Sequence, residues 1–582
     1  MSSYVPRVGI LLITAALIAG VTGCDGLSPS PFPYGHPSQN LEIQTWYDLD
    51  AVRNNLAGHH TLMNDLDSTT AGYEELASPT ANAGKGWEPI GTYDDQFTGT
   101  FDGQGDEIRD LFIDCADETG GGLFGDVGSG TIKNIGVVNF AVAGDFDVGV
   151  LVGRNAGFVL NCYCTMGNVT GDWDVGGLVG RSGRFVVNSY YDYDEVVVNG
   201  QHVITAGALF DEGFEEWLTN DKFLDVNERL SQENGYYVVN DVTDFKELLA
   251  FGQDDTLRFR LTNDLDLAGE PNFYIPYLAG EFDGNGHKIS NLSFNFSFVS
   301  KVGLFGQLAS DGTAHDMAAE NINITARSHV GGLVGWNEGG VSDSYSTGRV
   351  TGDQYVGGLV GVNDGAVSNS CSTGSVTGED FIGGLVGSNG DYGAVSNSYS
   401  TDNVTGEEAV GGLVGLNRRG TVSNSYSSGS VAGGYVVGGL VGANAGDVSD
   451  CYSTGSVTGQ DFIGALVGTN GKGSTVSNSY STGSVTCAGH DCLEVGGLVG
   501  VNCNPAGENC GTVSNSFWDM ETSGQSTSDG GTGKTTAEMQ DIATFLDAGW
   551  DITTVANPSE RNTAYIWNIV DAVTYPFLSW QD

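Results

Sequence analysis

The stretch Gly383-Gly384-Leu385-Val386-Gly387, followed after a turn by Val395-Ser396-Asn397-Ser398-Tyr399-Ser400-Thr401, decides the fold of this chain. The pentad or a near copy of it recurs with its leucine at positions 333, 359, 385, 413, 440, 466 and 498. Successive leucines are 26, 26, 28, 27, 26 and 32 residues apart. Earlier copies contain Leu151 and Leu178, and phenylalanine variants occupy 122–125 and 303–306. A period this constant indicates a solenoid.

The residue types of the repeat select the kind of solenoid. The polar run is rich in Ser, Thr, Val and Tyr, and Val395, Asn397, Tyr399 and Thr401 share one parity, which is typical of a strand. No proline occurs from 277 to 504, as unbroken strand ladders require. The pattern excludes an α-solenoid. It predicts an all-β fold, a parallel β-solenoid that we expect to be a right-handed β-helix.

In such a solenoid each residue lies above its own copy in the preceding coil. The position of Asn397 is predicted to form a structural ladder of hydrogen-bonded amides. Its members are Asn369, Asn397, Asn424, Asn478 and Asn515, with Asp343 and Asp450 at the same position. The position of Tyr399 predicts a stack of aromatic rings. A second asparagine series, which includes Asn363, Asn389 and Asn417, is predicted to lie in the turn after the pentad, where asparagine tolerates a left-handed backbone.

These repeats resemble the GLUG repeat family. Val-Gly-Gly-Leu-Val-Gly, a Gly/Asn turn and Ser-Asn-Ser-Tyr-Ser-Thr-Gly-Ser-Val carry the resemblance, which covers roughly 120–190 and 300–517. The resemblance implies a secreted or surface protein with a β-helical stalk or binding surface, as in adhesin-like proteins and some large surface peptidases. It brings no catalytic residues.

Composition and charge exclude several classes of protein. The chain has 582 residues, with 90 Gly and only 12 Pro, and no glycine at every third position, so it is not collagen. Hydrophobic residues make up 40%, too many for an acidic disordered chain. Its 73 acidic residues against 22 basic ones give a net charge of -51. We therefore expect no nucleic acid partner, because such partners need basic patches.

The start of the chain predicts export and lipid anchoring. Arg7 precedes an uncharged run from Val8 to Val21, and the segment ends in Val-Thr-Gly-Cys, which resembles a lipobox. Residues 1–23 are predicted to be a signal peptide and Cys24 the lipid attachment site. Residues 24–40 would be a Pro-rich tether to the membrane. The predicted location is the cell envelope, at the cell surface; a plain secretory signal is the alternative.

Two modules follow, each with its own caps. We place the first at 41–230 and the second at 231–582, with the second set of repeats at about 300–517. Both open with a short helix, at 45–56 and 243–250, and contain a Phe-Asp-Gly-x-Gly turn, at 101–105 and 282–286. Both continue after the repeats with a helix, near 214–218 and at 536–547, the latter with a capping box at Thr535 and Glu538. We expect these segments to cover the open ends of the solenoids.

Motifs that imitate catalytic or ligand sites have structural explanations. Asp-x-Asp pairs at 48–50, 65–67 and 264–266 could bind Ca²⁺, but copies recur at the same point of both modules and predict turns. Gly-Gly-Thr-Gly-Lys-Thr at 530–535 lacks the first glycine of a phosphate loop and predicts a turn with a helix cap. We therefore expect no catalytic residues, no metal site and no cofactor beyond adventitious Ca²⁺.

Cysteines indicate an oxidising compartment. Cys487, Cys492, Cys503 and Cys510 lie in insertions of the last coil and predict two disulfides, for which we favour sequential pairing. A zinc site that includes His490 is the alternative. The cysteines at 162, 164, 371 and 451 replace serine or tyrosine at ladder positions and are predicted to be small buried substitutes.

Taken together, these features favour a surface lipoprotein that is not an enzyme. The predicted function is adhesion or binding of an extracellular glycan or protein ligand through the repetitive face. The alternative is a polysaccharide lyase or hydrolase, which requires acids on successive coils at one stacked position; the Asn397 position supplies only Asp343 and Asp450, four coils apart. A structural envelope spacer is the third possibility.

Overall fold

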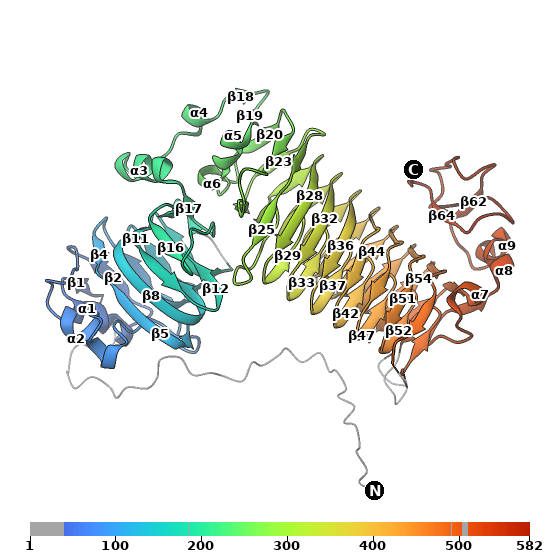
Figure 1. The fold of residues 1–582 in the computed structure, drawn as a ribbon, viewed down its shortest axis with the longest axis horizontal. Helices are drawn as coiled ribbons and strands as arrows, with labels where there is room; N and C mark the ends of the chain where they lie inside the picture. The colour runs from blue at the N-terminus through green and yellow to red at the C-terminus, as the bar shows by residue number, and fades with distance from the viewer. Residues whose placement is uncertain (1–39, 184–185, 490–491, 503–509, 582) are drawn as a thin grey trace, which may run out of the picture.

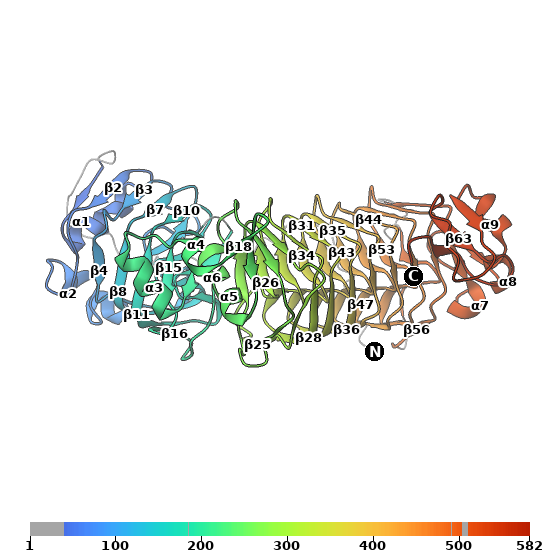
Figure 2. The same ribbon diagram turned by 90° about the horizontal axis from the view of Figure 1, so that it is seen from above.

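The computed structural model describes residues 40–183, 186–489, 492–502 and 510–581. It is an all-β parallel solenoid with a few short helices, as predicted. Figure 1 shows two stacks of strands, blue to cyan and green to orange, and Figure 2 shows that they form one elongated body. The predicted signal peptide, Cys24, residues 25–39 of the tether and Cys503 lie outside the described residues.

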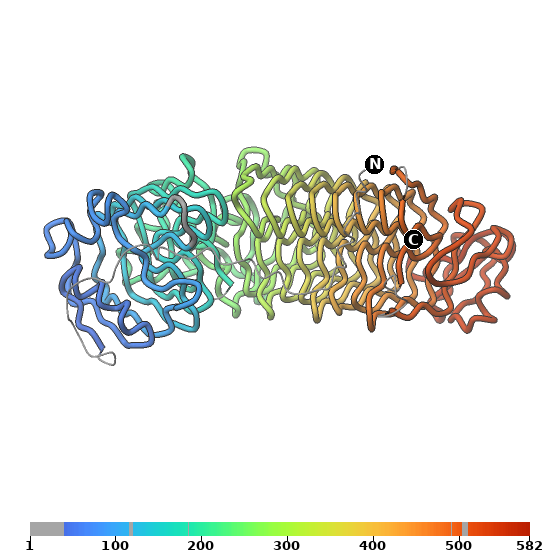
Figure 3. Tube along the Cα trace, turned by 90° about the horizontal axis from the view of Figure 1, so that it is seen from below, coloured from blue at the N-terminus to red at the C-terminus, as the bar shows by residue number. Residues whose placement is uncertain are grey.

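One coil of the second module contains five short strands: β37 (Asp380–Gly383), β38 (Val386–Asn389), β39 (Ala394–Ser396), β40 (Tyr399–Ser400) and β41 (Asn403–Thr405). Each strand pairs in parallel with its copies in the coils before and after it, so that Ser368, Ser396 and Ser423 are in register. The Cα trace in Figure 3 shows these coils as evenly stacked loops. Repetition of the pairing builds sheets of 12, 16, 9 and 7 strands.

The pentad supplies the core. The leucines at 333, 359, 385, 413, 440, 466 and 498 are all fully buried. Both pentad glycines are required by close packing: a Cβ on Gly383 would lie 2.0 Å from the carbonyl oxygen of Val386, and one on Gly384 would lie 2.1 Å from Oγ of Ser400. Larger residues at these positions would force the coil apart.

The two asparagine series have the opposite roles from those predicted. The second series is the continuous amide ladder, fully buried at the end of a strand: Nδ2 of Asn363 donates to Asn389 at 2.8 Å, and Nδ2 of Asn389 donates to Asn417 at 2.9 Å. The ladder runs unbroken through residues 337, 363, 389, 417, 444, 470 and 502.

The first series takes the left-handed backbone instead. Asn369, Asn397, Asn424, Asn478 and Asn515 have φ between 47° and 50°. Amide bonds along this row are partial: Asn397 donates to Asn369 at 3.3 Å, whereas Oδ1 of Asn424 is buried without a partner. This row is at a corner of the coil, where only glycine, asparagine and aspartate adopt positive φ at low cost.

The aromatic stack is confirmed. Rings of Tyr399, Tyr426, Tyr452 and Tyr480, here called the Tyr stack, lie 4.9–5.1 Å apart with interplanar angles of 3–5°. This separation matches the distance between neighbouring strands, so the stack follows directly from the stacking of the coils.

The helices are short. They are α1 (Trp46–Asp50), η1 (Ala51–Asn54), α2 (Tyr73–Leu76), η2 (Ala81–Gly84), α3 (Asp211–Thr219), α4 (Val226–Arg229), α5 (Val242–Lys246), α6 (Leu248–Phe251), α7 (Met520–Ser523), α8 (Thr536–Met539) and α9 (Ile542–Leu546). The opening caps are confirmed, because Trp46 and Leu49 of α1 and Phe245 of α5 are buried in the core of their modules. The capping box of Thr535 and Glu538 is also present, at the start of α8.

The segments after the repeats do not act as end caps alone; they lie on the side of the solenoid, over its tyrosines. The C-terminal segment, residues 535–581, places Trp550 and Trp567 against Tyr480, and Nε1 of Trp580 donates to the carbonyl of Asn424 at 3.0 Å. In the first module α3 does the same, with Trp217 against Tyr190 and its indole N–H bonded to Asn188. Outward tyrosines would otherwise expose a large apolar strip.

The two modules have separate sheets but touch each other. Strands up to β17 (Ala208–Leu209) pair only among themselves, as do those from β18 (Gln232–Glu233) to β61 (Thr532–Lys534), so the predicted boundary near 230 falls between them. Across the junction, the guanidinium of Arg327 lies 3.6 Å from the ring centre of Trp173, and Tyr190 Oη donates to Ala250 at 2.8 Å.

Within residues 40–581, apart from the gaps named above, the structure has no helix both long and apolar enough to cross a bilayer.

Candidate ligand sites on the outer surface

Most coils present the same small polar side chains outward, so a site is expected where the pattern breaks. The row that contains Ser342, Ser368 and Ser396 continues as serine to residue 514. At its start, however, the row holds Arg260, Asp283 and His315. These belong to β20 (Arg258–Leu261), β23 (Glu281–Asp283) and β27 (Thr313–His315), the first coils of the second module.

This charged cluster is an ion-pair network. The guanidinium of Arg258 binds the carboxylate of Glu281 at 2.7 Å, and Tyr236 Oη donates to the same carboxylate at 2.7 Å. Two residues further along the same strands, Arg260 binds Asp283 at 2.6 Å. The hydrogen bonds from Arg258 lower the pKa of Glu281 to about 2, against the opposing effect of burial.

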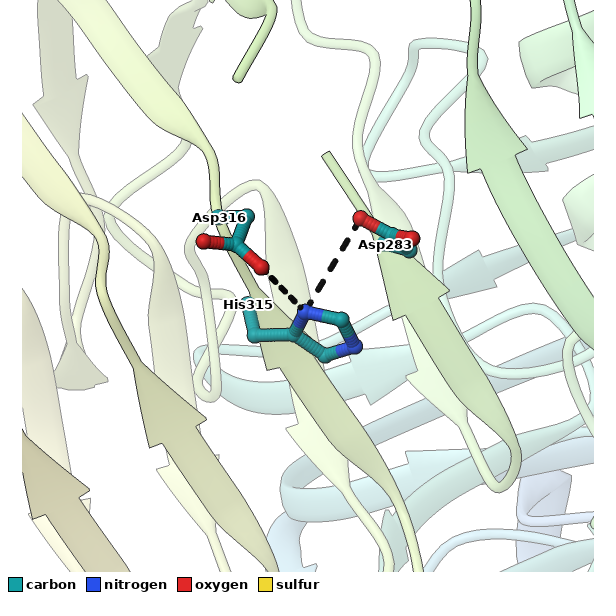
Figure 4. Close-up of side chains that lie close together, drawn as sticks. All are labelled: Asp283, His315 and Asp316. Carbon is teal, nitrogen blue, oxygen red and sulfur yellow. Dashed lines mark hydrogen bonds and ion pairs between the residues drawn. The ribbon is translucent and has the colours of Figure 1, made fainter. Parts of the chain in front are cut away.

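The imidazole of His315 contacts three carboxylates. Figure 4 shows its contacts with Asp283 and Asp316. Its Nδ1 lies 3.0 Å from Asp316 and 3.8 Å from Asp283, and its Nε2 lies 3.3 Å from Glu281. Burial lowers the pKa of His315, but hydrogen bonds to Asp316 and Glu281 outweigh it, and the pKa is raised overall.

Three side chains of the charged cluster are of types that bind metal ions. One ligand atom each from Asp283, His315 and Asp316 lies within 4.8 Å of the others. Asp283 is already neutralised by Arg260 and also accepts a hydrogen bond from the backbone N–H of Asn285 at 2.7 Å. A bound cation would therefore lie beside a guanidinium, and the residues fit an ion-pair network better than a metal site.

The first module has a simpler version of the same contact. Asp102 follows Phe101 as Asp283 follows Phe282, and it binds Lys133 at 2.9 Å. Lys133 pairs in register with Asp102 just as His315 pairs with Asp283, so Lys133 is the counterpart of His315 in the first module. The recurrence of an acid–base pair at this point of both modules indicates a structural role for the charged cluster.

This comparison predicts the effect of substitution at His315. Because the pKa of His315 is raised in the folded state, its ion pairs stabilise the fold fully at pH values below its unfolded pKa of about 6.5. This stabilisation is lost as the pH rises through the pKa of the folded state. Wild-type protein should lose up to about 1 kcal/mol between pH 6 and pH 8 from this group. His315→Lys should remove that loss, as measured by chemical unfolding at both pH values. An unchanged pH dependence in His315→Lys would contradict the assignment.

A cleft of about 850 Å³ lies at the start of the first module. We call it the Tyr93 cleft. Its lining is mostly polar and consists of Arg53, Asn54, Asn55, Leu56, Ala57, Tyr93, Asp94, Asp95, Gln96, Thr98 and Arg154. The ring of Tyr93 is 70% exposed, and the guanidinium of Arg154 lies 5.0 Å from its centre.

The charged walls of the Tyr93 cleft are held in place. Arg53 binds Asp50 at 2.9 Å and donates to the carbonyl of Pro89 at 2.6 Å. Arg154 is 3.7 Å from Asp126, a carboxyl that also accepts a hydrogen bond from Gln96 at 2.9 Å. Burial raises the pKa of Asp126 to about 6, although the charge of Arg154 opposes the shift.

Carboxylates do stack on successive coils, which the sequence analysis missed because it followed only the Asn397 row. Asp380 is in register with Glu408 on the next coil. In the neighbouring row, the backbone N–H of Glu379 donates to the carbonyl of Asp353, and the backbone N–H of Glu407 donates to the carbonyl of Glu379, so these three acids lie on consecutive coils. Glu379 and Glu407 are exposed. This acidic strip belongs to the outer surface of the second module, on coils remote from the Tyr93 cleft of the first.

The other predicted residues have structural roles. Asp48 completes the capping box of α1, and Asp67 binds the hydroxyls of Thr69 and Thr70 in a turn. Asp264 and Asp266 likewise bind residues of the next coil, His287 and Asn291. The Gly-rich stretch at 530–535 leads into α8 with the predicted helix cap, but its residues Thr532–Lys534 form the strand β61, where only a turn was predicted.

One of the two predicted disulfides is described in full. Cys487 and Cys492 are joined, with their Cα atoms 5.9 Å apart. Cys510 is also disulfide-bonded. Cys162, Cys164 and Cys451 are buried and Cys371 is half-buried, as expected of substitutes at ladder positions.

Comparison with known proteins identifies the repeats. The family model of the GLUG motif matches residues 326–351, 382–405, 406–432 and 433–458. The chain is 38% identical over 132 residues to halomucin of Haloquadratum walsbyi, which covers 22% of this chain and 1% of halomucin. It is 47% identical over 76 residues to a putative Gly-rich membrane protein of Evansella cellulosilytica, covering 13% and 8%. The chain thus matches under a tenth of the length of either relative.

Two solved structures superpose in part on the chain. A putative immunoglobulin A1 protease from Bacteroides ovatus superposes with a TM-score of 0.33 at 21% identity, covering 61% of this chain and 96% of that one. An IgA1 protease superposes with a TM-score of 0.34 at 18% identity, covering 42% and 21%. Neither adds to the argument about function.

Proposed function

We propose that this GLUG-repeat chain is an exported, lipid-anchored surface protein that binds an extracellular glycan through the Tyr93 cleft and acts in adhesion. The second module would be a rigid arm and spacer. Its relatives, a putative Gly-rich membrane protein and a halomucin, support a surface location. The observation that carries the proposal is the exposed Tyr93 among the charged and amide side chains that line the cleft.

The chemistry of the Tyr93 cleft suits a sugar. A sugar ring has an apolar face, which packs on an aromatic ring, and a rim of hydroxyls, which need donors and acceptors together. The cleft supplies both, through Tyr93 and through amide, carboxylate and guanidinium groups on its walls. Its volume falls within the usual range for small-ligand sites. By contrast, the ladder amides of residues such as Asn363 and Asn389 donate hydrogen bonds to one another, which leaves few free donors or acceptors for a ligand.

The test is glycan binding by the purified chain, first on an array and then by titration with the best glycan. Tyr93→Ala should weaken binding at least tenfold, about 1.4 kcal/mol. Tyr392→Ala is the matched control, because Tyr392 is 90% exposed in a turn of the second module. No binding of any glycan by the wild type, or an equal loss in Tyr392→Ala, would refute the proposal.

A polysaccharide-degrading enzyme is the second candidate, and the acidic strip is the observation that favours it. Stacked Asp380 and Glu408 supply the pair of carboxylates that glycoside hydrolysis uses. Release of reducing sugars from a polysaccharide, abolished by Asp380→Asn and retained in Tyr93→Ala, would establish this function in place of binding through the Tyr93 cleft.

A further inference from the structure

The chain contains five Asn-x-Ser/Thr acceptor sequences for N-linked glycans. Their asparagines are Asn168, Asn291, Asn295, Asn323 and Asn403. A transferase can modify such a sequence in an exported protein only where the amide and the hydroxyl two residues later are accessible. In a strand, residues i and i+2 point to the same face, so the geometry of the fold decides which of the five qualify.

Four of the five asparagines lie on one kind of surface. Asn168 is in β11 (Tyr163–Thr170), Asn295 in β25 (Ser293–Asn295), Asn323 in β28 (Ala318–Thr325) and Asn403 in β41. In each module these strands belong to the sheet that also contains the row of tyrosines. This row includes Tyr163 and Tyr190 in the first module and Tyr345 in the second. All four asparagines are exposed.

Their register makes the arrangement regular. Asn323 is in register with Arg349, Arg349 with Ser375, and Ser375 with Asn403, so Asn323 and Asn403 occupy one row three coils apart. Three coils correspond to about 14 Å at the usual strand spacing. Asn295 begins the neighbouring row, which continues through Thr325.

The amides also differ in their availability. Within the described residues, the side chains of Asn168, Asn295 and Asn323 have no hydrogen-bond partner, and Asn403 only accepts a bond, from Ser430. By contrast, Asn291 is engaged at both ends: its Oδ1 accepts from Asn321 at 2.6 Å, and its Nδ2 donates to Asp266 at 2.7 Å.

We infer that these strands carry N-linked glycans at Asn168 in the first module and at Asn295, Asn323 and Asn403 in the second, and that Asn291 stays unmodified. The donor would be an oligosaccharide carried on a lipid diphosphate. Nδ2 of the asparagine forms a bond to C1 of the sugar, and the bond from C1 to the diphosphate oxygen breaks. The lipid diphosphate leaves with the electron pair, and the amide loses one proton to the base of the transferase. The result would be a hydrophilic coat on one sheet of each module.

Mass spectrometry of the chain isolated from its own cells tests this inference. A protease that cuts at acidic residues suits it, since the chain has 73 Asp and Glu but only 22 Lys and Arg. Because no acidic residue lies between Asp283 and Asp311, a second protease that cuts after aromatic residues is added to separate Asn291 from Asn295 at Phe294. Peptides with the four exposed asparagines should be heavier by the mass of a glycan, and the peptide with Asn291 should have its unmodified mass. Unmodified peptides at all four sites would overturn the inference, and a modified Asn291 would overturn selection by the fold.

Two variants at one exposed residue control for misfolding. Thr170→Ala keeps Asn168 but removes the hydroxyl that the acceptor sequence needs, so occupancy of Asn168 should fall below detection while the other three sites stay occupied. Thr170→Ser restores the hydroxyl and should restore occupancy. Equal occupancy of Asn168 in Thr170→Ala and Thr170→Ser would show that the added mass is not an N-linked glycan.

Discussion

Replacing Asn389 by alanine is expected to lower the free energy of unfolding by about 3 kcal/mol. Asn389 is fully buried in the middle of the amide ladder, where it accepts from Asn363 at 2.8 Å and donates to Asn417 at 2.9 Å and to Gly393 at 3.1 Å. Its loss would leave buried donors and acceptors of the neighbouring coils without partners, each at a cost of about 1–3 kcal/mol. Denaturant unfolding followed by circular dichroism would measure it.

Asn397 provides the comparison within the same coil. It is half-buried with φ of 49°, and its side-chain amide donates along the row to Asn369 over a long distance of 3.3 Å. Asn397→Gly keeps the left-handed backbone accessible and should cost well under 1 kcal/mol. If Asn397→Gly were as damaging as Asn389→Ala, the assignment of the ladder to the second series would be wrong.

Replacing Asp402 by glycine is expected to stabilise the protein at neutral pH by about 2 kcal/mol. Asp402 is 1% exposed inside the solenoid, at the position where the neighbouring coil has Gly374. Burial raises its pKa to about 6, although hydrogen bonds from Ser372 and Ser400 oppose the shift. A pKa about two units above the unfolded value means that the charged side chain of Asp402 destabilises the fold by about 3 kcal/mol above pH 6. Glycine recovers less than this amount, because it has a greater backbone entropy in the unfolded chain.

The pH dependence gives the sign of this effect. Because the folded pKa of Asp402 is raised, the folded state binds the proton more tightly, and the penalty is absent below about pH 4 and complete above about pH 6. The stability gained in Asp402→Gly should therefore grow between pH 4 and pH 6 and then level off. Asp402→Asn keeps the size of the side chain and separates charge from backbone effects. A gain independent of pH would contradict the assigned cause.

The period of the sequence was enough to predict the fold, because a row that recurs every coil must stack. Leu385 and its copies are buried, and Tyr399 and its copies form a stack, as that argument requires. The argument could not distinguish the two asparagine series. Both recur once in each coil, and which of Asn389 and Asn397 turns inward depends on the backbone angles of the corner between them.

Contacts between distant parts of the chain could not be predicted from the period either. Trp567 and Trp580 pack beside tyrosines more than 100 residues earlier, and no repeat relates the C-terminal segment to them. The charged cluster was missed for a similar reason: Arg260, Asp283 and His315 are separated in sequence and meet only because their coils stack. The Tyr93 cleft was not predicted either, because Tyr93 belongs to no repeated motif of the sequence.

Distances between spin labels along one outward row test the stacking of coils most directly. Cysteines replacing Ala366, Thr421 and Thr512, in a Cys371→Ser background, lie in one row. Thr421 is two coils and Thr512 five coils from Ala366, so the backbone separations should be about 10 and 24 Å. Distances that increase by one strand spacing per coil are predicted. Distances that follow the sequence separation instead, or broad distributions, would contradict the solenoid.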